Sequence, residues 1–215
     1  MKVFKLWYPQ VMFSVANFFG ESDAIVIYDT EFTTWEGALE RGWSGPGEHR
    51  ELVQIAAQRV ELSTRSKLDS FECLIQPRIN PILSSYFTSL TNITQSDITN
   101  SGIGFAEAYT KFNEWRGSEV AYSYSKRVTD YTDADVLREN IHLSCLSWHV
   151  PKTEFKLLTP LFQAVGIDTN AYNSGKLYQA FNLSLESHHE HNAMDDVHSL
   201  TRSLFCALEQ LKSPL

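Results

Sequence analysis

The chain has 215 residues, 43% of them hydrophobic, which is enough for one sizeable core, and we expect a single domain over residues 1–215. Its net charge of −8 argues against a protein that coats a long duplex, because such proteins carry a basic surface. Its three cysteines are far apart and lack metal-ligand spacing, as is typical of a reduced, cytoplasmic protein: Cys73, Cys145 and Cys206.

The N-terminal segment, residues 1–21, combines two lysines with an uneven apolar stretch. It resembles a signal peptide weakly, but Tyr8, Pro9 and Gln10 interrupt it and no clean small-residue cleavage site follows. The stretch is also too short and too broken to span a membrane. We therefore expect this segment to pack on the domain, and we expect no membrane partner.

Three strands are predicted next, over residues 24–32, 52–60 and 71–76, and Pro77 ends the third. Each is an apolar run bounded by polar or turn-forming residues. Short polar links favour an antiparallel meander of these strands.

The loop over residues 34–50 is rich in glycine, which disfavours a regular element there. It carries Trp35 and Trp43. These indoles either anchor the loop to the domain, the commoner role of such aromatics, or form a lid or stacking surface beside the first strand.

Helices dominate the rest of the chain. Apolar and aromatic residues recur at helical spacing over residues 104–116 and predict an amphipathic helix. Further elements follow in chain order: a strand over 119–124, a helix that begins near Asp133, and a last helix marked by Val197, Leu200, Leu204, Leu208 and Leu211. The order of elements indicates an α/β fold in which helices pack on a sheet.

Two acids, Asp29 and Glu31, lie two residues apart at the end of the first predicted strand. Alternate side chains of a strand point to the same face, so the two carboxylates should point the same way. Two buried carboxylates repel each other unless a cation lies between them, and oxygen ligands suit Mg²⁺ or Mn²⁺ better than zinc. The alternative is a solvated strand end.

A second acidic cluster lies at the start of the last predicted helix, where His191 and Asp196 flank Ala193. If His191 lies in the loop and Asp196 in the first turns of the helix, both can converge on one site, and the small Ala193 leaves room for a close approach. The alternative is structural, because an acid near a helix N-terminus is favoured by the helix dipole.

A third candidate is Asp133, at the start of the preceding helix. Asp is a favoured N-cap, so this residue also has a structural interpretation. Asp130 and Asp135 lie nearby, and spacing alone does not choose among the three.

The run His-His-Glu-His ends at His191 and could hold zinc. No cysteine or further histidine lies at the usual ligand spacing. We instead expect His188 and His189 to lie on an exposed loop.

Taken together, these motifs resemble those of the DEDD-type 3′–5′ exonucleases whose fifth residue is a histidine. The first family motif is Asp-x-Glu with a following Thr, and the third is His-x-Ala-x-x-Asp. Both are present, and the residues that match them are Asp29, Glu31, Thr33, His191, Ala193 and Asp196.

The second family motif is matched best by Asp133 with Val136 and Leu137, although this region is longer than the usual form and lacks its tryptophan. The resemblance covers residues 22–212. Within the family, the chain is most similar to the branch that trims RNA 3′ ends, the "enhanced RNA interference" type, and its bacterial relatives. The resemblance implies a ribonuclease H-like mixed β-sheet flanked by α-helices.

The resemblance also implies a cofactor and a site. Two Mg²⁺ or Mn²⁺ ions would bridge the scissile phosphate and four carboxylates, those of Asp29, Glu31, Asp133 and Asp196. His191 would be the general base that takes a proton from the attacking water, because the pKa of a histidine lies near working pH.

The implied partner is the 3′ end of single-stranded RNA or DNA. Phe32 would stack on the terminal base and Thr33 would contact the nucleotide through its main chain, although core packing explains Phe32 equally well. Lys126 and Arg127 either hold upstream phosphates or are solvated. Several relatives are dimers, so a homodimer is an open alternative.

Two further functions stay open beside exonuclease activity. One is a non-catalytic nucleic-acid-binding module of the same fold, which the presence of all five expected side chains opposes. The other is a metal-dependent phosphohydrolase acting on nucleotides or very short oligonucleotides, which agrees with the low basic charge.

Overall fold

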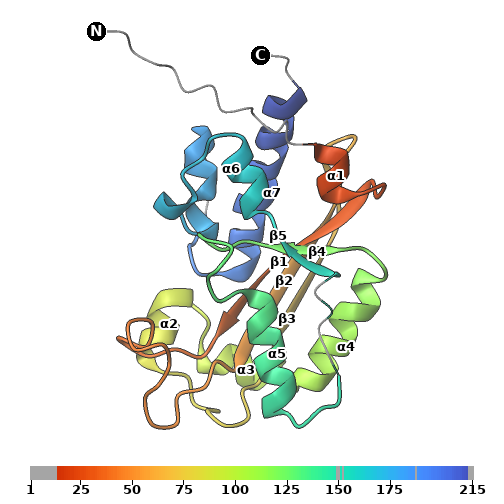
Figure 1. The fold of residues 1–215 in the computed structure, drawn as a ribbon. Coiled ribbons are helices and arrows are strands. Elements are labelled where there is room, and N and C mark those ends of the chain that lie inside the picture. The colour runs from red at the N-terminus through yellow and green to blue at the C-terminus, as the bar shows by residue number, and fades with distance from the viewer. Residues whose placement is uncertain (1–13, 149–150, 152, 187, 213–215) are drawn as a thin grey trace, which may run out of the picture.

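A five-stranded mixed sheet with the order β3-β2-β1-β4-β5 forms the centre of the protein (Figure 1). The computed structural model describes residues 14–148, 151, 153–186 and 188–212. β1 pairs antiparallel with β2 and β2 with β3, whereas β4 runs parallel to β1 and β5 parallel to β4. The predicted meander and mixed sheet are therefore confirmed. The strands are β1 (Ala24–Phe32), β2 (Leu52–Glu61), β3 (Ser66–Leu74), β4 (Ala121–Ser123) and β5 (Phe155–Leu157).

Helices cover both faces of this sheet. The predicted helices over 104–116, near Asp133 and at the C-terminus are confirmed, whereas shorter ones carry too few turns to show a periodic pattern. Within the described residues, no helix has the length and apolar character needed to cross a membrane. The helices are α1 (Val15–Phe19), α2 (Ser85–Thr91), α3 (Gln95–Ser101), α4 (Phe105–Arg116), α5 (Asp133–Leu143), α6 (Thr159–Ala164), α7 (Ala193–Lys212) and the 3₁₀ helices η1 (Thr169–Ala171) and η2 (Ser174–Phe181).

β1 contributes alternate residues to two separate cores. Ile25 and Ile27 pack in the core under α6 and α7, whereas Val26 and Tyr28 pack in the core under α4 and α5. The same alternation continues to the end of the strand. The acids at positions 29 and 31 therefore share the face that α7 covers.

The strand β4 is short, and this opens the edge of β1 beside the acids. Its register with β1 covers only Val26 and Ile27, so residues 28–32 of β1 have no β4 neighbour. The start of α5 reaches the sheet at this edge, where the Thr30 hydroxyl donates a hydrogen bond of 2.7 Å to Asp133 Oδ1. Asp133 thus approaches the acids from the side opposite to α7.

The third strand lies earlier than predicted, at Ser66–Leu74 instead of 71–76. It is an edge strand whose first residues are mostly exposed, so the hydrophobic pattern that marks a strand is absent from its first half.

The N-terminal segment is described from residue 14 onward, and residues 1–13 lie outside the described part. Phe19 is buried in the α6–α7 core, and Phe18 and Phe19 both contact the Tyr122 ring, with centroids 5.8 Å and 5.3 Å away. The described part of this segment therefore packs on the sheet.

Candidate active site

The two carboxylates of β1 are buried. Asp29 is 6% exposed and Glu31 is 9% exposed. Burial raises the pKa of Asp29 well above its usual range, and the nearby Asp133 and Asp196 carboxylates raise it further. The pKa of Glu31 is raised for the same reasons, with burial again the largest cause. The end of β1 is therefore buried, and the alternative of a solvated strand end is wrong.

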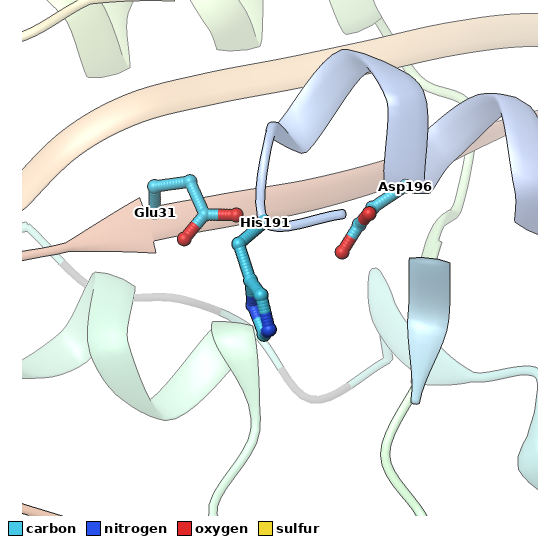
Figure 2. Close-up of side chains that lie close together, drawn as sticks. All are labelled: Glu31, His191 and Asp196. Carbon is cyan, nitrogen blue, oxygen red and sulfur yellow. The ribbon is translucent and has the colours of Figure 1, made fainter. Parts of the chain in front are cut away.

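The start of α7 brings a histidine and a third acid to this pair. One ligand atom each of Glu31, His191 and Asp196 lies within 4.8 Å of the others, and Figure 2 shows the three side chains close together. Ala193 is fully buried, and its N–H donates a hydrogen bond of 3.0 Å to Gln54 Oε1 of β2. This bond fixes the start of α7 against the sheet, beside Glu31.

The carboxylates of Asp195 and Asp196 make different contacts. Asp195 accepts a hydrogen bond of 2.9 Å from the main-chain N–H of His189. Asp196 is 2% exposed, burial raises its pKa to about 7, and its Oδ1 has no hydrogen-bond partner among the described residues. Asp195 closes the loop before α7, whereas Asp196 presents a free oxygen to the cluster.

The N-cap interpretation of Asp133 is wrong. Thr132 caps α5, and Asp135 completes a capping box with it. Asp133 bonds to Thr30 instead, and burial raises its pKa to about 6. The cap is supplied by its neighbours, so the Asp133 carboxylate is available to the cluster.

Asp130 lies elsewhere. Its carboxylate accepts hydrogen bonds from Arg127 Nε at 2.9 Å and from the Arg127 main-chain N–H at 3.1 Å. Both this arginine and Lys126 are exposed. Among the three candidate acids of this region, the structure brings Asp133 to the β1 pair.

His188 and His189 are partly buried, so the expectation of an exposed loop is wrong. The His188 ring packs edge-on against Tyr178, with centroids 5.3 Å apart. Neither histidine belongs to the group formed by Glu31, His191 and Asp196.

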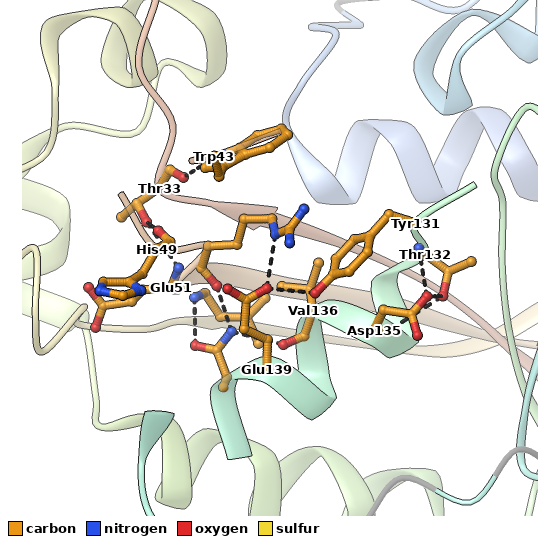
Figure 3. Close-up of polar contacts among 12 residues, drawn as sticks. Thr33, Trp43, His49, Glu51, Tyr131, Thr132, Asp135, Val136 and Glu139 are labelled. Atoms are coloured by element: carbon orange, nitrogen blue, oxygen red, sulfur yellow. Dashed lines mark hydrogen bonds and ion pairs between the residues drawn. The ribbon is translucent and has the colours of Figure 1, made fainter. Parts of the chain in front are cut away.

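Thr33 is 3% exposed and ties the ends of the 34–50 loop together (Figure 3). Its hydroxyl donates to the His49 carbonyl oxygen at 2.5 Å and accepts from the Glu51 N–H at 3.0 Å. Its main-chain N–H donates to the Glu51 carbonyl oxygen at 2.8 Å, and its carbonyl oxygen accepts from Trp43 Nε1 at 3.1 Å. All of its polar groups are therefore used within the protein.

A stack of rings and one guanidinium joins this loop to α5. The Trp43 ring lies 5.5 Å from the Phe32 ring, and the Arg50 guanidinium lies 5.1 Å from the Trp43 ring and 3.7 Å from the Tyr131 ring. Arg50 Nε and the Tyr131 hydroxyl both donate to Glu139 Oε2, at 2.9 Å and 2.6 Å (Figure 3). Trp43 therefore anchors the loop and also backs the Phe32 ring.

Comparison with known proteins places these features in a family. A family model described as exonuclease, of the RNase T type, matches residues 26–204. That stretch includes all five side chains of the candidate site. The chain belongs to the exonuclease family.

Two animal proteins are similar in sequence to part of this exonuclease-family chain. The 3′–5′ exonuclease Snipper of Drosophila melanogaster is 32% identical over 96 residues, which cover 45% of this chain and 32% of the relative. ERI1 exoribonuclease 2 of Xenopus laevis is 28% identical over 91 residues, which cover 42% of this chain and 12% of the relative. The matches thus span about a third or less of each relative.

Solved structures share the fold. The nuclease domain of 3′hExo, a DEDDh family member bound to rAMP, has a TM-score of 0.70 at 19% identity and covers 90% of this chain and 94% of that domain. Cell-death related nuclease 4 has a TM-score of 0.66 at 18% identity, with 85% and 62% covered. The ribonuclease H-like fold and the family resemblance are confirmed.

Two residues beside the candidate site carry no motif that the sequence analysis could use. Ser174 and Gly175 open η2 and lie against Asp196: the Ser174 hydroxyl donates to Asp196 Oδ2 at 2.8 Å. A Ser-Gly pair in a loop region carries no signal of its own, because these residues are common in turns. Only the position of η2 against α7 reveals their role.

Proposed function

We propose that this protein is a metal-dependent 3′–5′ exonuclease that releases 5′-mononucleotides from the 3′ end of single-stranded RNA or DNA. The observation that carries the proposal is the convergence of four buried or partly buried carboxylates and one histidine from three motifs. Family membership and the names of the two animal relatives, an exonuclease and an exoribonuclease, support the same reaction.

The donor set of the cluster fits a hard divalent cation. All four acids offer oxygen, which Mg²⁺ and Mn²⁺ prefer. Asp196 Oδ1 is buried without a hydrogen-bond partner among the described residues, as expected of an oxygen reserved for a cation. We assign two ions to Asp29, Glu31, Asp133 and Asp196. When bound, such ions would lower the pKa of a water molecule and stabilise charge on the leaving 3′ oxygen.

His191 is suited to accept a proton. Burial lowers its pKa below the usual histidine value, so its ring is mostly neutral at neutral pH. Its side chain lies close to those of Glu31 and Asp196 in Figure 2, and the residue belongs to the loop that precedes α7. We therefore assign His191 as the general base toward the attacking water.

Phe32 directly follows the β1 acids and is the best candidate to stack on the terminal base. Stacking tolerates any base, so we expect little sequence preference. Thr33 acts behind it, because its hydrogen bonds hold Trp43 and the end of the loop in place. With a net charge of −8, stacking and bound cations would supply more of the affinity than basic side chains.

The proposal is tested with 5′-labelled RNA and DNA oligonucleotides, single- and double-stranded, with Mg²⁺ or Mn²⁺ and with chelator. We expect shortening from the 3′ end that chelator abolishes, and the matched substrates identify the preferred strand. An oligonucleotide left intact with both metals would overturn the proposal.

The middle carboxylate has a matched control in the same segment. Asp133→Asn should abolish turnover, because it removes a ligand from the cluster, whereas Asp130→Asn should not. The reverse result would move the ligand assignment from Asp133 to Asp130.

A further inference from the structure

A serine in the first turn of η2 holds the Asp196 carboxylate, although this serine belongs to none of the three family motifs. The Ser174 hydroxyl donates a hydrogen bond of 2.8 Å to Asp196 Oδ2. The other oxygen, Oδ1, is buried and has no hydrogen-bond partner among the described residues. Ser174 therefore occupies one oxygen of Asp196 and leaves the other available.

Gly175 gives the available oxygen its space. A Cβ at this position would lie 2.4 Å from Asp196 Oδ1, well inside van der Waals contact. The main chain of Gly175 is not in the left-handed region, so its conformation alone does not require glycine. The carboxylate imposes the requirement.

A second serine fixes η2 on the helix that carries Asp196. Ser199 is fully buried on α7, and its Oγ donates to the Ser174 carbonyl oxygen at 2.6 Å. The same Oγ accepts a hydrogen bond of 3.3 Å from the Tyr178 N–H. These two hydrogen bonds hold the start of η2 against α7 and so keep Ser174 close to Asp196.

We propose that Ser174 and Gly175 are positioning residues that decide which oxygen of Asp196 faces the divalent cation. This inference rests on the proposed function in one respect, that the acidic cluster binds such a cation. A hydrogen bond to one carboxylate oxygen orients the other before the cation arrives, so the cation does not have to order the side chain. Losing an outer partner of this kind costs about 10- to 100-fold in metal affinity or activity.

The test is calorimetric titration of the full chain with Mn²⁺ in the absence of nucleic acid. Ser174→Ala should raise the Kd for Mn²⁺ about 10- to 100-fold. Ser174→Thr keeps the hydroxyl and should recover most of the affinity. Gly175→Ala should weaken binding at least as much as Ser174→Ala, because its methyl group displaces the free oxygen.

Ser203→Ala is the matched control. Ser203, like Ser199, is a fully buried serine on α7, and its hydroxyl donates to the Ser199 carbonyl oxygen at 2.8 Å and not to Asp196. This variant should bind Mn²⁺ with the wild-type Kd. Equal weakening in Ser203→Ala and Ser174→Ala would show a merely structural effect and overturn the inference.

The two proposals fail in different ways. A wild-type chain that binds no Mn²⁺ and degrades no oligonucleotide overturns the proposed function. An active wild type whose Ser174→Ala and Gly175→Ala variants bind Mn²⁺ normally overturns only the positioning role. If Ser174→Ala loses its metal-free thermal transition, Ser174→Thr and Gly175→Ala decide the question.

Discussion

The 34–50 loop and the 188–192 loop border the same acidic cluster but are held by different contacts. The first is tied by hydrogen bonds to the buried Thr33 and by the stack of Trp43 and Arg50. The second is held by the Asp195 bond to His189 and by an ion pair of 3.0 Å between Lys176 and Glu190.

The difference is one of energy. Buried hydrogen bonds are costly to break, whereas an exposed ion pair is worth only about 0–1 kcal/mol. The 34–50 loop therefore forms a fixed wall behind Phe32. We expect the 188–192 loop, which carries His191, to be the easier of the two to displace. On this comparison, the surface that would take the base is held more firmly than the loop whose side chain would take the proton.

The largest effect is expected at His191. His191→Ala should lower turnover about 10²- to 10⁴-fold, because a general base contributes that much, while the Kd for Mn²⁺ stays near the wild-type value. Steady-state kinetics and Mn²⁺ titration measure the two quantities. His198→Ala is the control, since His198 is an exposed histidine on α7, the helix that follows the loop of His191.

Two outcomes with His191→Ala would contradict the view that the 188–192 loop carries the general base. Near-normal turnover means that His191 is not the base. Loss of Mn²⁺ affinity together with turnover means that His191 is a metal ligand, which its place beside Glu31 and Asp196 allows.

An intermediate effect is expected at Trp43. Trp43→Ala should raise KM for an oligonucleotide several-fold and lower the free energy of unfolding by about 2–4 kcal/mol, because Phe32 loses its backing and the loop loses its anchor. Leu39→Ala, in the same loop, changes a side chain that is 74% exposed and should alter neither quantity. An unchanged KM in Trp43→Ala would show that the 34–50 loop does not contribute to substrate binding.

The smallest effect is expected at Lys176. Lys176→Ala breaks the exposed pair with Glu190 and should lower turnover about two- to fivefold, as expected for at most about 1 kcal/mol. Because salt screens exposed pairs, the difference from wild type should shrink at high ionic strength. A large, salt-independent loss would show that this loop is held as firmly as the first.

Much of this arrangement is visible in the sequence. β1 matches its predicted bounds, because an apolar run followed by acids marks both its burial and its end. Asp29, Glu31, His191 and Asp196 converge as their motifs indicate. The long helices follow from apolar residues at helical spacing, which a single chain displays directly.

Other features depend on tertiary contacts that local sequence does not encode. The cap of α5 is local, since Thr132 and Asp135 form it together, but the bond that brings Asp133 to Thr30 of β1 is a tertiary contact. Ser174 becomes informative only when η2 packs on α7. The edge strand β3 shows no hydrophobic alternation over its exposed half, so its start is invisible to a periodicity argument.

Because the carboxylates are buried together, the metal-free protein keeps protons on them at a pH where free carboxylates are ionised. Asp196, with a pKa raised to about 7, and Asp133, at about 6, hold protons at a pH where the unfolded chain has released them. The folded state then binds more protons than the unfolded state, so the free energy of unfolding of the metal-free protein falls as pH rises from about 4 to beyond 7. A cation must displace those protons, so metal binding releases acid and strengthens with pH.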